Sequence, residues 1–160
     1  MEFTIDQSIS GPLADVEEAL FDEEFVAASS ALPRVADCEL RNVQRSGDRI
    51  RAEVYRRFDA PLNAAVRRVI DPAKLTWVEQ IDYDTARHRG RHTIVPDNYA
   101  DRVHAEYRTR LAPSTAGTRR VTSGTMTVNA RFVGGKIEQA IVSGLEEYAV
   151  GEARLLSRWT

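Results

Sequence analysis

The chain has 160 residues, the usual size of one domain, and is long enough to bury a hydrophobic core without disulfides or metals. Its 22 basic and 24 acidic residues give a net charge of −2, which argues against a dedicated nucleic-acid binder or a basic membrane-surface protein. The single cysteine excludes an internal disulfide framework and a cysteine-rich zinc site.

The sequence begins directly with an alternating pattern rather than with the basic start and apolar core of a signal peptide. No apolar run approaches the roughly 20 residues that a membrane-spanning helix needs. With one thiol and no export signal, we expect a cytoplasmic protein that makes no integral membrane contact.

The first part of the chain predicts a strand, two short helices and a pair of strands. Phe3, Ile5 and Ile9 alternate with polar residues, as in a half-buried strand. Apolar residues at helical spacing follow from Leu13 to Leu20, and Asp22 starts a second short helix that ends before Pro33. Two strands are expected over 35–45 and 49–58, joined by a turn at 46–48.

The middle of the chain predicts four more strands, preceded by a segment with a helical apolar stripe. That stripe consists of Leu62, Val66, Val69 and Ile70, in the segment 61–70. The strands are expected over 74–84, 87–95, 102–112 and 119–130, and turn residues at 96–98 and 113–117 separate the last three.

A long amphipathic helix is expected from the glycines at 134–135 to about Arg158. Its apolar face comprises Ile137, Ile141, Leu145, Tyr148, Leu155, Leu156 and Trp159. Gly144 and Gly151 border this face, where they either allow close packing or leave a cavity. Consecutive strands with short turns indicate an antiparallel sheet, and only this helix is long enough to cover it. We therefore expect one α+β domain over residues 1–160, with a curved seven-stranded antiparallel sheet around a long C-terminal helix.

This order of elements resembles the START-related (SRPBCC) superfamily and its helix-grip fold, in an uncharacterised bacterial branch. The resemblance covers essentially the whole chain and is carried by residues 3–9, by 75–79 and by the helix entry at 133–138. It implies an apolar cavity between sheet and helix. Members bind lipids, sterols or polyketides there, and a few catalyse cyclisation or hydrolysis. The segment 61–70 would lie at the cavity mouth, either as a lid that opens or as a static plug.

Strand alternation places two charged residues on the inner face of the sheet. Arg56 shares the phase of Ile50 and Val54, and Glu79 shares the phase of Trp77. On neighbouring strands the two either form a cross-strand ion pair or anchor the polar group of a ligand. General acid catalysis by Glu79 is a third interpretation.

The same alternation points His88 and His92 inward, about 13 Å apart, which is too far for both to bind one metal. Either could hydrogen-bond a ligand or serve the structure alone. Glu152 lies on the apolar helix face, where it either faces the cavity or reaches water beside Trp159. The predicted ligand-contacting residues are Arg56, Trp77, Glu79, His88, His92, Tyr107, Met126, Tyr148 and Glu152. No residue is assigned a catalytic role, and no metal or cofactor is expected.

Charge is unevenly distributed over the outer surface. Arginines at 87, 89, 91, 102, 108 and 110 are expected on the outer sheet face, and acidic residues crowd the first two helices. These are either solvated faces or a surface for a protein partner or an anionic ligand. The favoured function is noncovalent binding of an apolar or amphipathic small molecule, lipid-like or polyketide-like. The alternatives are a cyclase or dehydratase, in which Glu79 would act with His88 or His92, and a protein-interaction module with a collapsed cavity.

Overall fold

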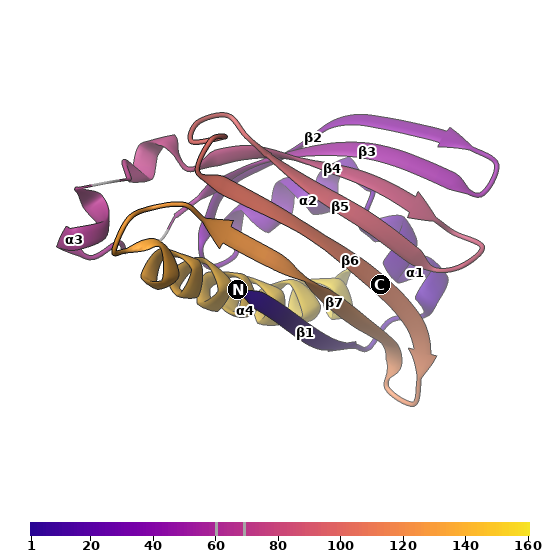
Figure 1. Ribbon diagram of the computed structural model, residues 1–160. Helices are drawn as coiled ribbons and strands as arrows, with labels where there is room; N and C mark the ends of the chain where they lie inside the picture. The colour runs from indigo at the N-terminus through magenta and orange to yellow at the C-terminus, as the bar shows by residue number, and fades with distance from the viewer. Residues whose placement is uncertain (60, 69) are drawn as a thin grey trace.

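The computed structural model describes residues 1–59, 61–68 and 70–160, and it has the expected helix-grip architecture (Figure 1). The strands are β1 (Glu2–Ile9), β2 (Val35–Ser46), β3 (Arg49–Phe58), β4 (Thr76–Asp84), β5 (Arg89–Pro96), β6 (Val103–Ser114) and β7 (Gly117–Val128). The helices are α1 (Leu13–Ala19), α2 (Glu23–Ala28), α3 (Ala64–Arg67) and α4 (Gly134–Trp159), with short 3₁₀ helices at Ser29–Ala31 and Pro72–Lys74. Among the described residues, no helix is both long and apolar enough to cross a membrane.

The seven strands form one antiparallel sheet in the order β1-β7-β6-β5-β4-β3-β2. The first strand of the chain, β1, pairs with the last, β7, so the two ends of the sheet-forming part of the chain lie on neighbouring strands. The register of β2 on β3 shifts between Val35 and Asp37 and again between Leu40 and Asn42. Such irregularities bend and twist a strand, and they contribute to the curvature with which the sheet wraps around α4.

Two details of the local structure differ from the sequence prediction. The expected loop at 113–117 is a tight hairpin, because Ser114 pairs with Gly117 and the strands extend up to it. Gly117 supplies the positive φ of 125° that this turn requires. Glu152 does not reach water near the helix end: it is only 5% exposed, so that alternative is wrong.

Helix α4 lies across the concave face of the sheet (Figure 1). It approaches the sheet closely at Gly144. A Cβ atom at Gly144 would lie 2.8 Å from Cζ of Phe58, and one at Gly151 would lie 3.2 Å from Cδ2 of Leu32. The small residues on this face therefore allow close packing. Ile137 and Leu156, which are 2% and 0% exposed, anchor the helix at its two ends.

The buried apolar side chains form two separate clusters. The first lies under α1 and α2 and includes Phe25, Val54 and Leu156. The second lies towards α3 and the start of α4 and includes Met126 and Ile137. On β6, Thr109 stands between Leu111 of the first cluster and Ala105 of the second. On β4, Glu79 stands between Ile81 of the first cluster and Leu75, which packs against the second. This division positions the site described below.

The segment 61–70 belongs to the second cluster. Leu62, Val66 and Ile70 are 7%, 2% and 3% exposed and pack among its members. The segment contains the short helix α3, which lies beyond one end of the sheet in Figure 1. Val69, the remaining residue of the predicted stripe, lies outside the described residues. The tight packing of the other three favours the static plug over the lid.

Candidate functional site

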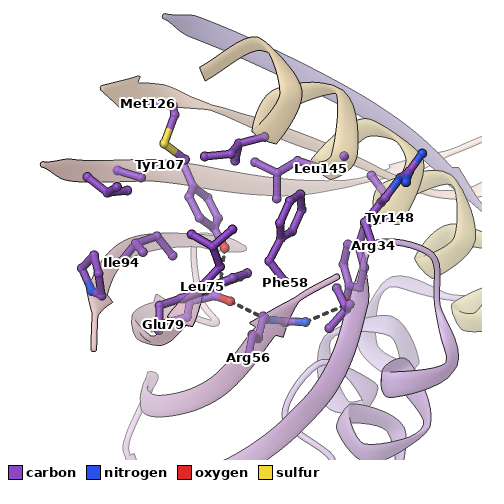
Figure 2. A pocket seen from close by; sticks show the side chains of 18 of the residues that line it. Arg34, Arg56, Phe58, Leu75, Glu79, Ile94, Tyr107, Met126, Leu145 and Tyr148 are labelled. Carbon is purple, nitrogen blue, oxygen red and sulfur yellow. Dashed lines mark hydrogen bonds and ion pairs between the residues drawn. The ribbon is translucent and has the colours of Figure 1, made fainter. Parts of the chain in front are cut away.

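A cavity of about 140 Å³ lies between the concave sheet face and α4. Its walls are mainly apolar and come from both layers, as Figure 2 shows for Phe58, Ile94, Met126 and Leu145. The lining residues Lys74 and Asn98 are exposed, which marks the end that opens to solvent. The apolar lining also includes Phe3, Ile5, Leu75, Val103, Ala105 and Ile141.

The inner end of the cavity is closed by a group of buried and half-buried polar side chains that we call the polar layer. Its members are Gln7, Arg56, Glu79, His92, Tyr107, Arg120, Tyr148 and Glu152. They come from β1, β3, β4, β5, β6, β7 and α4, and they separate the two apolar clusters. All except His92 line the cavity directly.

Arg56 and Glu79 form an ion pair on the concave face, as the sequence predicted. Nε of Arg56 lies 2.9 Å from Oε2 of Glu79, and the two side chains are 15% and 5% exposed. Nη1 of Arg56 also donates to the Tyr148 hydroxyl at 2.7 Å and to Sγ of Cys38 at 3.4 Å. Figure 2 marks the bonds from Arg56 to Glu79 and to Tyr148, which link the sheet to the helix. The pair therefore fixes α4 as well as the two strands.

Glu79 is held as a carboxylate by three donors. Its Oε1 accepts hydrogen bonds from the Tyr107 hydroxyl and from Nδ1 of His92, the latter at 2.7 Å. Burial alone would raise the pKa of Glu79, but the Arg56 guanidinium and these two hydrogen bonds outweigh it and hold the pKa well below its usual range. Burial and the neighbouring Glu79 carboxylate raise the pKa of Tyr107 well above that of a free tyrosine.

A second ion pair joins β7 to α4. Nη1 of Arg120 lies 2.7 Å from Oε2 of Glu152, with the side chains 10% and 6% exposed. Glu152 also accepts from Nε2 of Gln7 at 3.4 Å and from the Tyr148 hydroxyl at 3.2 Å. The Tyr148 hydroxyl thus accepts from Arg56 and donates to Glu152, and it connects the two ion pairs into one network.

The two predicted histidines lie in different surroundings. His92 is 4% exposed, stacks on Tyr107 with ring centroids 4.4 Å apart, and places Nε2 2.9 Å from the Thr109 hydroxyl. It lines a smaller space of about 30 Å³ on the α2 side of the polar layer. His88 lies in the turn before β5 with a φ of 51°, and its Nδ1 is 2.8 Å from Oε1 of Glu17 on α1. The same Glu17 oxygen accepts from the Tyr83 hydroxyl, so His88 faces the helix-covered side of the sheet, but it is not among the residues that line the cavity.

The structure therefore brings most of the predicted residues together around one cavity. Arg56, Trp77, Glu79, Tyr107, Met126, Tyr148 and Glu152 line it. Arg120 and Gln7 also line the cavity but were not predicted, although they share the strand phase of Met126 and Phe3. Within the described residues, no group of three or more His, Cys, Asp or Glu side chains is arranged to hold a metal ion.

Four of the six arginines predicted for the outer sheet face lie on it. Arg89 stands opposite Arg110, and Arg91 stands opposite Arg108, on the exposed face of β5 and β6. Arg91 is 3.1 Å from Glu106. The predicted arginines at 87 and 102 lie in turns instead. A partner at this face stays a prediction.

The sequence profile of the family described as "Protein of unknown function (DUF2505)" matches residues 4–160. No curated protein matches the sequence. Among solved structures, TTHA0849 from Thermus thermophilus is 19% identical with a TM-score of 0.67, and the match covers 99% of this chain and 96% of that one. The Zhui aromatase/cyclase from Streptomyces sp. R1128 is 16% identical with a TM-score of 0.63, covering 99% and 90%. Ara h 8.0201 is 14% identical with a TM-score of 0.59, covering 99% and 96%. These structural similarities confirm the helix-grip fold.

Proposed function

The chain belongs to the DUF2505 family, and we propose that it binds an apolar or amphipathic small molecule noncovalently in the cavity between the sheet and α4. The observation that carries the proposal is the composition of the cavity: apolar walls lead from an open end to an inner end where hydrogen-bonding groups converge. Concave apolar sites with a few placed polar groups are typical of small-molecule binding. A lipid-like or polyketide-like compound fits this description.

The network around Glu79 supports binding rather than catalysis. A cyclase or dehydratase needs an acid that gives up a proton near neutral pH. Glu79 has a lowered pKa and already accepts from Arg56, His92 and Tyr107, so it has no proton to donate. His92 lies on the far side of the polar layer from the main cavity. The Zhui aromatase/cyclase has the same fold, so cyclisation in this cavity is the alternative function.

The cavity volume bears on the third candidate, an interaction module with a collapsed interior. A single water molecule needs a cavity volume of roughly 10–15 Å³, and this cavity has a volume of about 140 Å³. A collapsed interior would leave no such space between Phe58, Ile94 and Leu145. The open volume therefore favours ligand binding.

A fluorescence titration with the neutral hydrophobe N-phenyl-1-naphthylamine tests the proposal. Ala105 is 9% exposed and lines the cavity, so Ala105→Phe should fill part of it and weaken probe binding by about tenfold or more. Ala112→Phe is the matched control, because it places the same ring on the same strand without lining the cavity. Circular dichroism verifies that both variants fold. Equal probe affinity in the two variants would contradict the proposal. Compounds that displace N-phenyl-1-naphthylamine from the protein can then be incubated with it, and mass spectrometry shows whether any of them is converted to a product.

A further inference from the structure

The cavity lining contains two buried N–H groups without an acceptor. Among the described residues, Nε of Arg120 and Nε1 of Trp77 have no hydrogen-bond partner, although both side chains line the cavity. Arg120 is 8% exposed. Buried donors in folded proteins are nearly always paired, with protein, water or ligand, because an unpaired donor costs free energy. These two donors therefore call for an acceptor that the chain does not supply.

The carboxylates of the same site have no comparable spare capacity. Glu79 accepts from Arg56, His92 and Tyr107, and its two oxygens are both occupied. Glu152 accepts from three donors as well: Gln7, Arg120 and Tyr148. Each carboxylate thus has most of its roughly four acceptor positions filled. The buried side-chain groups of the lining that have no partner among the described residues are both donors.

The charges of the polar layer also balance. The two guanidinium groups of Arg56 and Arg120 are matched by the two carboxylates at 2.9 Å and 2.7 Å. A buried ligand charge would have no counter-charge here, and burying an unpaired charge is strongly unfavourable. The inner end of the cavity therefore suits an uncharged group.

From these three observations we propose that the ligand carries a neutral acceptor oxygen, such as the carbonyl of a ketone, an ester or a quinone, which accepts a hydrogen bond from one of these two donors, Nε of Arg120 or Nε1 of Trp77. The apolar body of the ligand then occupies the walls formed by residues such as Ile94 and Leu145. This inference rests on the proposed function and specifies the ligand's class. The competing source of the acceptor is an ordered water, which would confer no preference for an oxygen-bearing ligand.

Displacement of N-phenyl-1-naphthylamine by three molecules that share one bicyclic skeleton tests this inference. The molecules are tetralin, which has no oxygen, 1-tetralone, which has one carbonyl, and the anion of tetralin-1-carboxylic acid. The wild-type protein should bind 1-tetralone about tenfold more tightly than tetralin, as expected for one hydrogen bond from a charged donor. It should also bind 1-tetralone more tightly than the carboxylate.

The double variant Arg120→Lys/Trp77→Phe removes both donors and keeps the positive charge beside Glu152. In this variant the preference for 1-tetralone over tetralin should disappear. The matched control is Arg119→Lys/Trp159→Phe, which makes the same replacements at exposed residues outside the cavity and should keep the preference. The ratio of the two affinities is the measured quantity, so a general change in cavity size does not mimic the effect.

The outcomes separate the two proposals. If N-phenyl-1-naphthylamine does not bind at all, the proposed function falls. If it binds but tetralin and 1-tetralone displace it equally, or neither displaces it, ligand binding stands and the acceptor inference is overturned. Tighter binding of the carboxylate than of 1-tetralone, or a preference that survives in the double variant, would overturn it too.

Discussion

Replacing Glu79 with Gln removes one charge from the polar layer while nearly preserving its shape. Oε2 of Glu79 lies 2.9 Å from Nε of Arg56, and the side chains are 5% and 15% exposed. The substitution leaves the Arg56 guanidinium buried without its counter-charge. Breaking a buried ion pair in this way costs about 3–5 kcal/mol. Since a domain of this size is stable by roughly 5–15 kcal/mol, the loss is a large fraction of the total.

The same two strands offer a matched control. Nη1 of Arg49 lies 3.0 Å from Oδ1 of Asp82, a pair of similar geometry between β3 and β4, but its side chains are 58% and 47% exposed. Asp82→Asn should therefore cost no more than about 1 kcal/mol. Urea unfolding followed by circular dichroism gives the free energy of unfolding for each variant. If Glu79→Gln and Asp82→Asn agree to within about 0.5 kcal/mol, the reasoning from burial is refuted.

Three further outcomes follow from the described packing and charges. The folded pKa of Glu79 lies below the ordinary value of 4.5, so its stabilisation is complete above about pH 4.5 and is lost as the pH falls towards the folded pKa. The stability gap between wild type and Glu79→Gln should therefore narrow in acid, and a constant gap from pH 7 to pH 3 would contradict this. Leu156→Ala should cost about 2–5 kcal/mol because Leu156 is fully buried, whereas Leu145→Ala should cost less because that side chain faces an existing cavity; urea unfolding ranks them, and the reverse order would be evidence against the placement of α4. Gly144→Ala should lack the usual gain of about 1 kcal/mol for such a change in a helix, because the new Cβ would lie 2.8 Å from Phe58; a full gain in the same assay would show that the helix does not approach the sheet there.

Strand alternation was enough to predict the faces of the sheet. Because side chains alternate strictly along a strand, Arg56 and Glu79 could be placed inward from their apolar neighbours alone. The same rule turns Arg120 and Gln7 inward, although neither was among the predicted ligand-contacting residues. The rule does not apply to His88, which lies in the turn before β5 and has a positive φ.

Which charged residues pair across the two layers could not be predicted from the sequence. The partner of Glu152 depends on where α4 crosses β7, and no local pattern encodes that crossing. For the same reason, the sequence left open whether Gly144 leaves a cavity or allows close packing. Both questions concern distances between elements, which arise from packing of the whole domain rather than from the periodicity of any one segment.

The central claim, that a ligand occupies the space between the sheet and α4, can be tested most directly by the two methionines. The chain has only Met1 and Met126. Met126 is 6% exposed and lines the cavity, whereas Met1 is 43% exposed. Protein labelled with ¹³C at the methionine methyl groups gives one signal from each, and Met126→Leu assigns them. With bound N-phenyl-1-naphthylamine, we predict nuclear Overhauser effects from the probe to the Met126 methyl group and none to Met1. Contacts to Met1 alone, or a Met126 signal that is unchanged at saturation, would contradict the account.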